Sequence, residues 1–116
     1  MIPERRGISE VEIEVIRAAL DRALVRTVDE TASGTIATLE VIGHCECGCA
    51  SVDFDSPVSD EHAAPIANGT GTTPRGGQVG VIVWGRSDAI TGFEIYDMGA
   101  GDDDLVLPVP KSVVPW

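Results

Sequence analysis

The nine residues from Gln78 to Arg86 constrain the fold more than any other part of the sequence, because they alternate as a strand and are apolar on both sides. One side carries Val79, Val81 and Val83, and the other carries Ile82 and Trp84. A strand that is apolar on both faces lies in the middle of a sheet or has its second face covered by a partner. We therefore expect a sheet whose second face needs a cover, and a homodimer would supply it.

One amphipathic helix is expected from Ser9 to about Val25. Ser9 and Glu12 have the spacing of a capping box, in which each side chain bonds the backbone N–H of the other residue. The apolar residues that recur at helical spacing and would face the core are Ile13, Ile16, Ala19, Leu20, Ala23 and Leu24. A second patch, formed by Val11, Val15 and Ala18, either widens this core contact or belongs to an interface.

Four other segments have strand-like patterns. They are Thr35–Val41, Ser51–Asp55, Pro65–Thr72, which its glycines make the weakest, and Ile90–Tyr96, which follows a hairpin tip at Ser87-Asp88. A turn or loop is expected at 73–77, and the Pro-rich segment 105–116 is expected to be extended without forming a central strand. This order predicts an α+β fold, with one N-terminal helix packed on a single antiparallel sheet of four to five strands, in a single domain over residues 1–116.

The charge of the chain limits its partners. The 116 residues carry a formal net charge of −11, and such a surface repels phosphate backbones and anionic membranes. We therefore expect neither a nucleic acid nor a membrane as a partner, whereas a basic protein or a cation fits the field. No segment approaches the roughly 18 apolar residues of a membrane span, and the first residues lack a signal-peptide pattern. These observations favour a cytoplasmic protein.

The most unusual motif is His44-Cys45-Glu46-Cys47-Gly48-Cys49. If the preceding strand continues through it, the three thiols share a buried face, where free cysteines behave as small hydrophobes. Cys45 and Cys49 would then lie about 13 Å apart, too far for one zinc ion or a disulfide to bridge. We therefore expect no bound metal or other cofactor. Zinc bound by Cys45, Cys47 and Cys49, with His62 as a fourth ligand, is one alternative, and reactive-thiol chemistry is another.

Other polar residues carry little chemical information. His62 lies in the polar stretch Asp60-Glu61-His62, where a lone histidine is usually solvated, although it has the chemistry of a general base. Asp102-Asp103-Asp104 lacks the alternating ligands and closing glutamate of a calcium loop, and is expected to be a solvated acidic turn. The chain has no nucleophile elbow, phosphate loop or dinucleotide fingerprint. We therefore expect no catalytic residue.

The stretch from Gly43 to Trp116 resembles a group of small bacterial proteins of uncharacterised activity. The shared marks are Cys45-Glu46-Cys47-Gly48-Cys49 running into Val52-Asp53-Phe54, and the late strand Phe93-Glu94-Ile95-Tyr96 before a Pro-rich end. The resemblance covers about two-thirds of the chain and implies an intact native domain. It implies no activity and no catalytic residue.

Three functions from different classes follow from these observations. The leading hypothesis is a non-catalytic, acidic interaction or accessory module, for example one that neutralises a basic partner as an immunity protein or an antitoxin does. The first alternative is a metal-binding protein that uses the three thiolates. The second is a small enzyme or ligand-binding domain with a pocket between the helix and the sheet, in which Tyr96 and Glu94 would be the polar residues.

Overall fold

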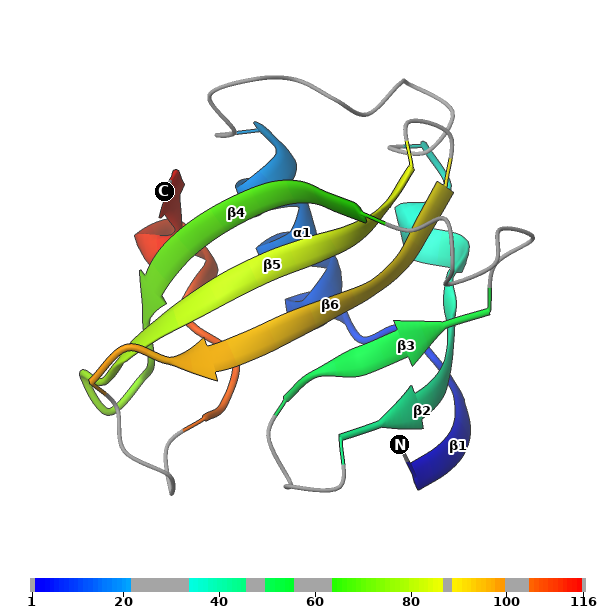
Figure 1. Cartoon of the computed structure of the whole chain (residues 1–116), viewed down its shortest axis with the longest axis horizontal. Helices are drawn as coiled ribbons and strands as arrows, with labels where there is room; N and C mark the ends of the chain where they lie inside the picture. The colour runs from blue at the N-terminus through cyan, green and yellow to red at the C-terminus, as the bar shows by residue number, and fades with distance from the viewer. Residues whose placement is uncertain are drawn as a thin grey trace.

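One α-helix and one antiparallel sheet make up the core of the part of the chain that the structure describes (Figure 1). The structure is a computed structural model that describes residues 2–21, 34–45, 50–55, 64–86, 89–99 and 105–115. The helix is α1 (Glu10–Asp21), and the strands are β1 (Ile2–Gly7), β2 (Glu40–His44), β3 (Val52–Phe54), β4 (Ala64–Thr72), β5 (Gln78–Arg86), β6 (Ala89–Asp97) and β7 (Val114–Pro115). Their order in the sheet is β1-β2-β3-β6-β5-β4-β7. The α+β prediction is confirmed, but the sheet has seven strands instead of four to five.

Helix α1 packs against the inner face of the sheet, behind β4 and β5 in the view of Figure 1. Its buried residues are Glu12, Val15, Ile16 and Ala19, and they meet the inward side chains of β5 and β6, which include Val79, Val81, Val83, Phe93 and Ile95. The predicted core face was therefore rotated slightly. Val15, assigned to the flanking patch, is fully buried, whereas Leu20 is partly exposed. The predicted end of the helix at Val25 lies outside the described residues.

Strand β4 lies almost where the sequence predicted it, but it is better paired than its glycines suggested. Residues 64–72 pair with β5 at every position except Ile66, where the register shifts. The glycines allow the C-terminal segment to approach closely, because a Cβ atom on Gly69 would lie 2.9 Å from the carbonyl oxygen of Val114, and one on Gly71 would lie 2.6 Å from Cβ of Pro108. Gly69 and Gly71 are thus strand residues at a close contact and not turn residues.

The predicted strand Thr35–Val41 is wrong in its first half. Residues Ile36–Thr38 form a 3-10 helix, η1, and strand β2 begins only at Glu40. The backbone N–H and the hydroxyl of Thr38 both donate to the carbonyl oxygen of Thr35, at 2.9 and 2.7 Å. These bonds close the turn and allow Ile36 to reach the core, where it is 1% exposed. The alternating pattern of the sequence does not distinguish this turn from a strand.

The two edge strands were not predicted. Strand β1 pairs with β2, and the short β7 pairs with Gly69 and Thr70 of β4. Between β6 and β7, residues Pro110–Ser112 form the 3-10 helix η4, which lies on the same side of the sheet as α1. The hydroxyl of Ser112 accepts the N–H of Thr72 at 2.8 Å, and Val113 is fully buried. The C-terminal segment therefore completes the core on the helix side and leaves the outer face of β5 uncovered by it.

Strands β3 and β6 join two halves of the sheet along a short seam. Their ladder consists of Val52 opposite Phe93 and Asp53 opposite Gly92. The hydroxyl of Ser51 extends the seam, because it accepts the N–H of Ile95 at 2.8 Å and lies 3.3 Å from the Ile95 carbonyl oxygen. The β1-β2-β3 half is thereby attached to the β6-β5-β4-β7 half. No helix in the described part of the chain has both the length and the apolar character needed to cross a membrane.

Candidate functional site

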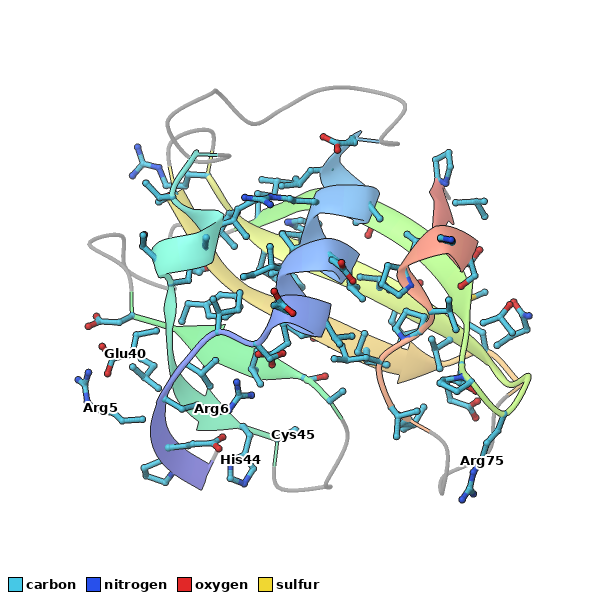
Figure 2. The ribbon with its side chains drawn as sticks, turned by 180° about the vertical axis from the view of Figure 1, so that it is seen from behind. Arg5, Arg6, Glu40, His44, Cys45 and Arg75 are labelled. Carbon is cyan, nitrogen blue, oxygen red and sulfur yellow. The ribbon has the colours of Figure 1, made fainter. Side chains whose placement is uncertain are left out.

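A hollow of about 530 Å³ opens where β1 leads into α1, and we call it the β1–α1 hollow. Its lining comes from five parts of the chain and consists of Glu4, Arg6, Ser9, Glu12, His44, Ala50, Val52 and Leu107. Figure 2 shows Arg6, His44 and Cys45 together at this end of the molecule, with Arg75 on the hairpin tip far from them. Charged and apolar side chains therefore face one concave surface.

Arg6 and Glu12 form the innermost pair of this surface. The two terminal nitrogens of Arg6 donate to the two carboxylate oxygens of Glu12 at 2.7 and 2.8 Å. Glu12 also accepts the backbone N–H of Ser9 at 2.8 Å, while Ser9 Oγ accepts the N–H of Glu12 at 3.2 Å. The predicted capping box is confirmed, and the structure adds a bidentate arginine to it.

These contacts determine the ionisation of Glu12. Burial by itself would raise the pKa of this carboxyl, but the hydrogen bonds from Arg6 and Ser9, together with the charge of Arg6, outweigh burial and hold the pKa of Glu12 below its usual value. Glu12 is therefore a carboxylate that positions the start of the helix and the guanidinium group of Arg6.

Glu4 and His44 form the outer pair of the β1–α1 hollow. The Nδ1 atom of His44 lies 2.9 Å from Oε2 of Glu4, and Oε1 of Glu4 lies 3.3 Å from Nε of Arg6. Both side chains of the outer pair are about one-third exposed. The carboxylate fixes the orientation of the imidazole ring through Nδ1 and leaves Nε2 as its second polar atom.

Of the cysteine motif, the structure describes His44 and Cys45, while Cys47 and Cys49 lie outside the described residues. Strand β2 ends at His44, and the N–H of Cys45 donates to the carbonyl oxygen of Ser51 at 3.1 Å. Cys45 and Ser51 thus extend the antiparallel pairing of β2 and β3 by one contact beyond His44 and Val52. The expected strand therefore ends at His44 and does not continue into Cys45. Cys45 is partly exposed, and not buried as the strand phase implied.

A second surface lies on the outer face of β4, β5 and β6, the side of the sheet turned away from α1 (Figure 1). Trp84, Ile82 and Tyr96 share this face and are each partly exposed. Tyr96 stands opposite Gly80, and its ring occupies the space that a side chain at position 80 would need. We call this surface the aromatic outer face.

Two carboxylates lie on the same side of the sheet as the aromatic outer face. Glu94 is exposed and lies opposite Ile82 in the ladder. Asp53 shares the face from the neighbouring strand, since it pairs with Gly92, and Gly92 in turn pairs with Trp84. Because Gly92 lies between them and has no side chain, no side chain on β6 separates Trp84 from Asp53 at this position. One basic residue, Arg86, lies at the end of the same face of β5.

The structure describes only some of the site residues that were proposed from the sequence. Tyr96 and Glu94 do not line a pocket between helix and sheet, because they point to the opposite side of the sheet. Cys47, Cys49, His62 and the Asp102-Asp103-Asp104 turn lie outside the described residues. The residues that the structure does describe contain no group of three or more histidine, cysteine or acidic side chains placed to hold one metal ion.

The β1–α1 hollow was not predicted from the sequence. Glu12 was recognised as a capping residue, and His44 was noted as the first residue of the cysteine motif, but Glu4 and Arg6 were not connected with either. Their spacing by two residues is the signal that was available, since it places both on one face if residues 2–7 form a strand. Comparisons of the chain with protein-family models, with curated proteins and with solved structures found no match in any of the three.

Proposed function

We propose that the protein is a non-catalytic interaction module that binds a basic segment of a partner protein on the aromatic outer face. The observation that carries this proposal is the arrangement of Trp84, Ile82 and Tyr96 beside the carboxylates of Glu94 and Asp53. Partly exposed aromatic side chains are enriched at interfaces, where they contribute large contact areas.

The chemistry of this face fits lysine and arginine side chains. A guanidinium or ammonium group over the face of an indole or phenol ring gains cation–π attraction. Glu94 and Asp53, which lie on β6 and β3 beside Ile82 and Trp84, supply charge-assisted hydrogen bonds to such a group. The net charge of −11 adds long-range attraction, which increases the rate of association with a basic partner.

A second copy of the chain is the competing occupant of this face. The sequence predicts a homodimer for the same reason, namely that the apolar residues of β5 need a cover. A symmetric dimer would bring two copies of Glu94 and Asp53 into one interface, between chains that each carry a net charge of −11. This repulsion favours a partner of opposite charge, and the homodimer stays a prediction for light scattering to test.

The test uses a fluorescently labelled peptide of ten residues that alternates arginine and serine. In a Trp116→Phe background Trp84 is the sole tryptophan, so its emission reports contact with this face. At about 0.15 M salt, where exposed charges further apart than about 8 Å are screened, we expect the peptide to shift the Trp84 emission. We also expect Glu94→Lys to weaken binding by about tenfold.

Glu14→Lys is the matched control, because it changes the net charge by the same amount on the exposed side of α1. We expect it to weaken binding by no more than about threefold. Equal losses in the two variants would mean that the peptide responds to net charge alone, and the aromatic outer face would then be the wrong site. A light-scattering mass of twice 12.2 kDa that returns to 12.2 kDa in Glu94→Lys would identify a second copy as the occupant and overturn the proposal.

A further inference from the structure

The β1–α1 hollow contains polar atoms that remain available after the protein's own ion pairs have formed. Its most buried charged groups, Arg6 and Glu12, already form an ion pair with each other. Glu12 is 4% exposed in its side chain and holds two nitrogens of Arg6 at 2.7 and 2.8 Å, while Arg6 also donates to the carbonyl oxygen of Gly7 at 3.2 Å. The positive charge of Arg6 is therefore largely balanced, and an anionic ligand would have to displace Glu12 to reach it.

Nearer the opening of the hollow, Glu4 and His44 are more exposed and form fewer hydrogen bonds with the protein. Glu4 is 33% exposed, and its only contact with Arg6 among the described residues is a single bond of 3.3 Å to Nε. Glu4 holds His44 through Nδ1, so the Nε2 atom of the ring is the one left for a ligand. When the imidazole is neutral with its proton on Nδ1, Nε2 is a hydrogen-bond acceptor. The opening thus presents one carboxylate and one acceptor nitrogen.

The remaining wall of the hollow is apolar. Ala50, Val52 and Leu107 contribute aliphatic surface, and both Ala50 and Leu107 pack against the core. Ala50 and Leu107 come from separate parts of the chain, and the N–H of Ala50 donates to the carbonyl of Leu105 at 3.0 Å, which holds the two segments together. A pocket with an apolar wall and a few converging polar groups is the usual form of a small-molecule site.

We infer that the β1–α1 hollow binds a small organic cation with a primary ammonium group and an apolar body. The ammonium group donates hydrogen bonds to Glu4 and to Nε2 of His44, and the body lies against Val52 and Leu107. An ammonium is satisfied by two or three acceptors, whereas metal sites generally use three or more protein ligands. The net charge of −11 favours a cation over an anion. This inference is independent of the function proposed for the aromatic outer face.

The experiment compares three probes that share one ring and differ in charge, namely benzylamine, benzyl alcohol and benzoate. Each is titrated into the isotopically labelled wild-type protein and followed through its backbone amide chemical shifts. We expect benzylamine to shift the signals of His44, Val52 and Leu107 and to bind about fivefold more tightly than benzyl alcohol, with benzoate weakest. Equal affinities for the three probes would overturn the inference without any variant being needed.

Two variants then test the assigned group. Glu4→Gln keeps the size of the side chain and removes its charge, and we expect it to reduce the affinity for benzylamine about fivefold, to the level of benzyl alcohol. Glu14→Gln removes the same charge from an exposed position of α1 and is expected to change the affinity by less than about twofold. Equal effects of the two variants would contradict the inference. Shifts confined to Trp84 and Tyr96 would also overturn it, while supporting the aromatic outer face as the cation site.

Discussion

The ring of Tyr96 lies across Gly80 on the outer face of the sheet, in the space that a side chain at position 80 would occupy. The two residues stand opposite each other on β6 and β5. An aromatic ring that covers a cross-strand glycine protects the backbone and fixes the position of the ring. Gly80 therefore determines where Tyr96 lies on the aromatic outer face.

We predict that Gly80→Ala destabilises the protein by about 1–3 kcal/mol, because the added methyl group overlaps the Tyr96 ring and forces it to move. Urea unfolding measures the loss. Gly7→Ala is the control, since a Cβ atom there meets no other atom within 4 Å. A stability for Gly80→Ala equal to that of Gly7→Ala would show that Tyr96 does not occupy this position.

The orientation of α1 predicts an order among its core variants. Ile16 is fully buried, and Leu20 is only partly buried. Ile16→Ala is expected to cost about 2–5 kcal/mol, Leu20→Ala less, and Ser9→Ala about 1 kcal/mol through the loss of the helix cap. Chemical denaturation of the three variants gives the order directly. A larger loss for Leu20→Ala than for Ile16→Ala would contradict the burial of these two side chains in the structure.

Glu12 predicts how stability depends on acid. The pKa of Glu12 is lowered in the folded protein, so its contribution to stability is fully present above the unfolded pKa of about 4.3 and is lost as the pH falls through the folded value. Glu12→Gln should therefore be less stable than the wild type at pH 7, and the difference should shrink below about pH 4. Urea titrations at several pH values measure this difference.

The control for this experiment is Glu14→Gln, which removes an exposed carboxylate from the same helix. We expect Glu14→Gln to have an acid profile close to that of the wild type. If the stability of Glu12→Gln falls with acid as steeply as that of the wild type, the Arg6–Glu12 pair is not the cause of the pH dependence.

Cys45 predicts a measurable thiol reaction in the folded state. Because Cys45 is partly exposed just beyond the end of β2, we expect it to react with a thiol reagent before unfolding in a Cys47→Ser/Cys49→Ser variant. The sequence had instead placed all three thiols on a buried face, where a thiol reacts slowly. Reaction of this variant only in denaturant would show that Cys45 is protected after all.

The prediction that the protein binds no stoichiometric metal remains open to elemental analysis. A thiolate site would gather further negative charge in an acidic chain, and no lysine or arginine lies between His44 and Arg75 to offset it. We expect less than about 0.1 equivalent of zinc in protein purified without chelator. One equivalent of zinc that is lost in Cys47→Ser would establish the thiolate site instead.

The sequence predicted the elements whose signals are local. The cap at Ser9, the strand Gln78–Arg86 and the turn at 73–77 were predicted correctly, because capping, alternation and turn residues act within a few positions. Strand β1 was missed because Pro3-Glu4-Arg5-Arg6 has no apolar alternation and is held by pairing with β2, about 40 residues away.

The candidate sites depended on contacts of the same long range. Glu4 and His44 are separated by 40 positions, and no pattern in either segment indicates the other. The aromatic outer face was foreseen in part, since the alternation of β5 showed that Ile82 and Trp84 share a side. The presence of Asp53 on this face was not foreseen, because it depends on the pairing of β3 with β6.

The short seam between β3 and β6 makes the sheet easiest to open along one line. Two ladder pairs and the Ser51 hydroxyl hold this line, so the amide protons of Val52 and Phe93 should exchange with solvent sooner than that of Val81 within the long strands. Asp53 and Trp84 stand on opposite sides of the line. A ligand that contacts both residues would hold the two halves of the sheet together. It would therefore slow amide exchange at Val52 and Phe93 in the seam, even if it contacts neither residue.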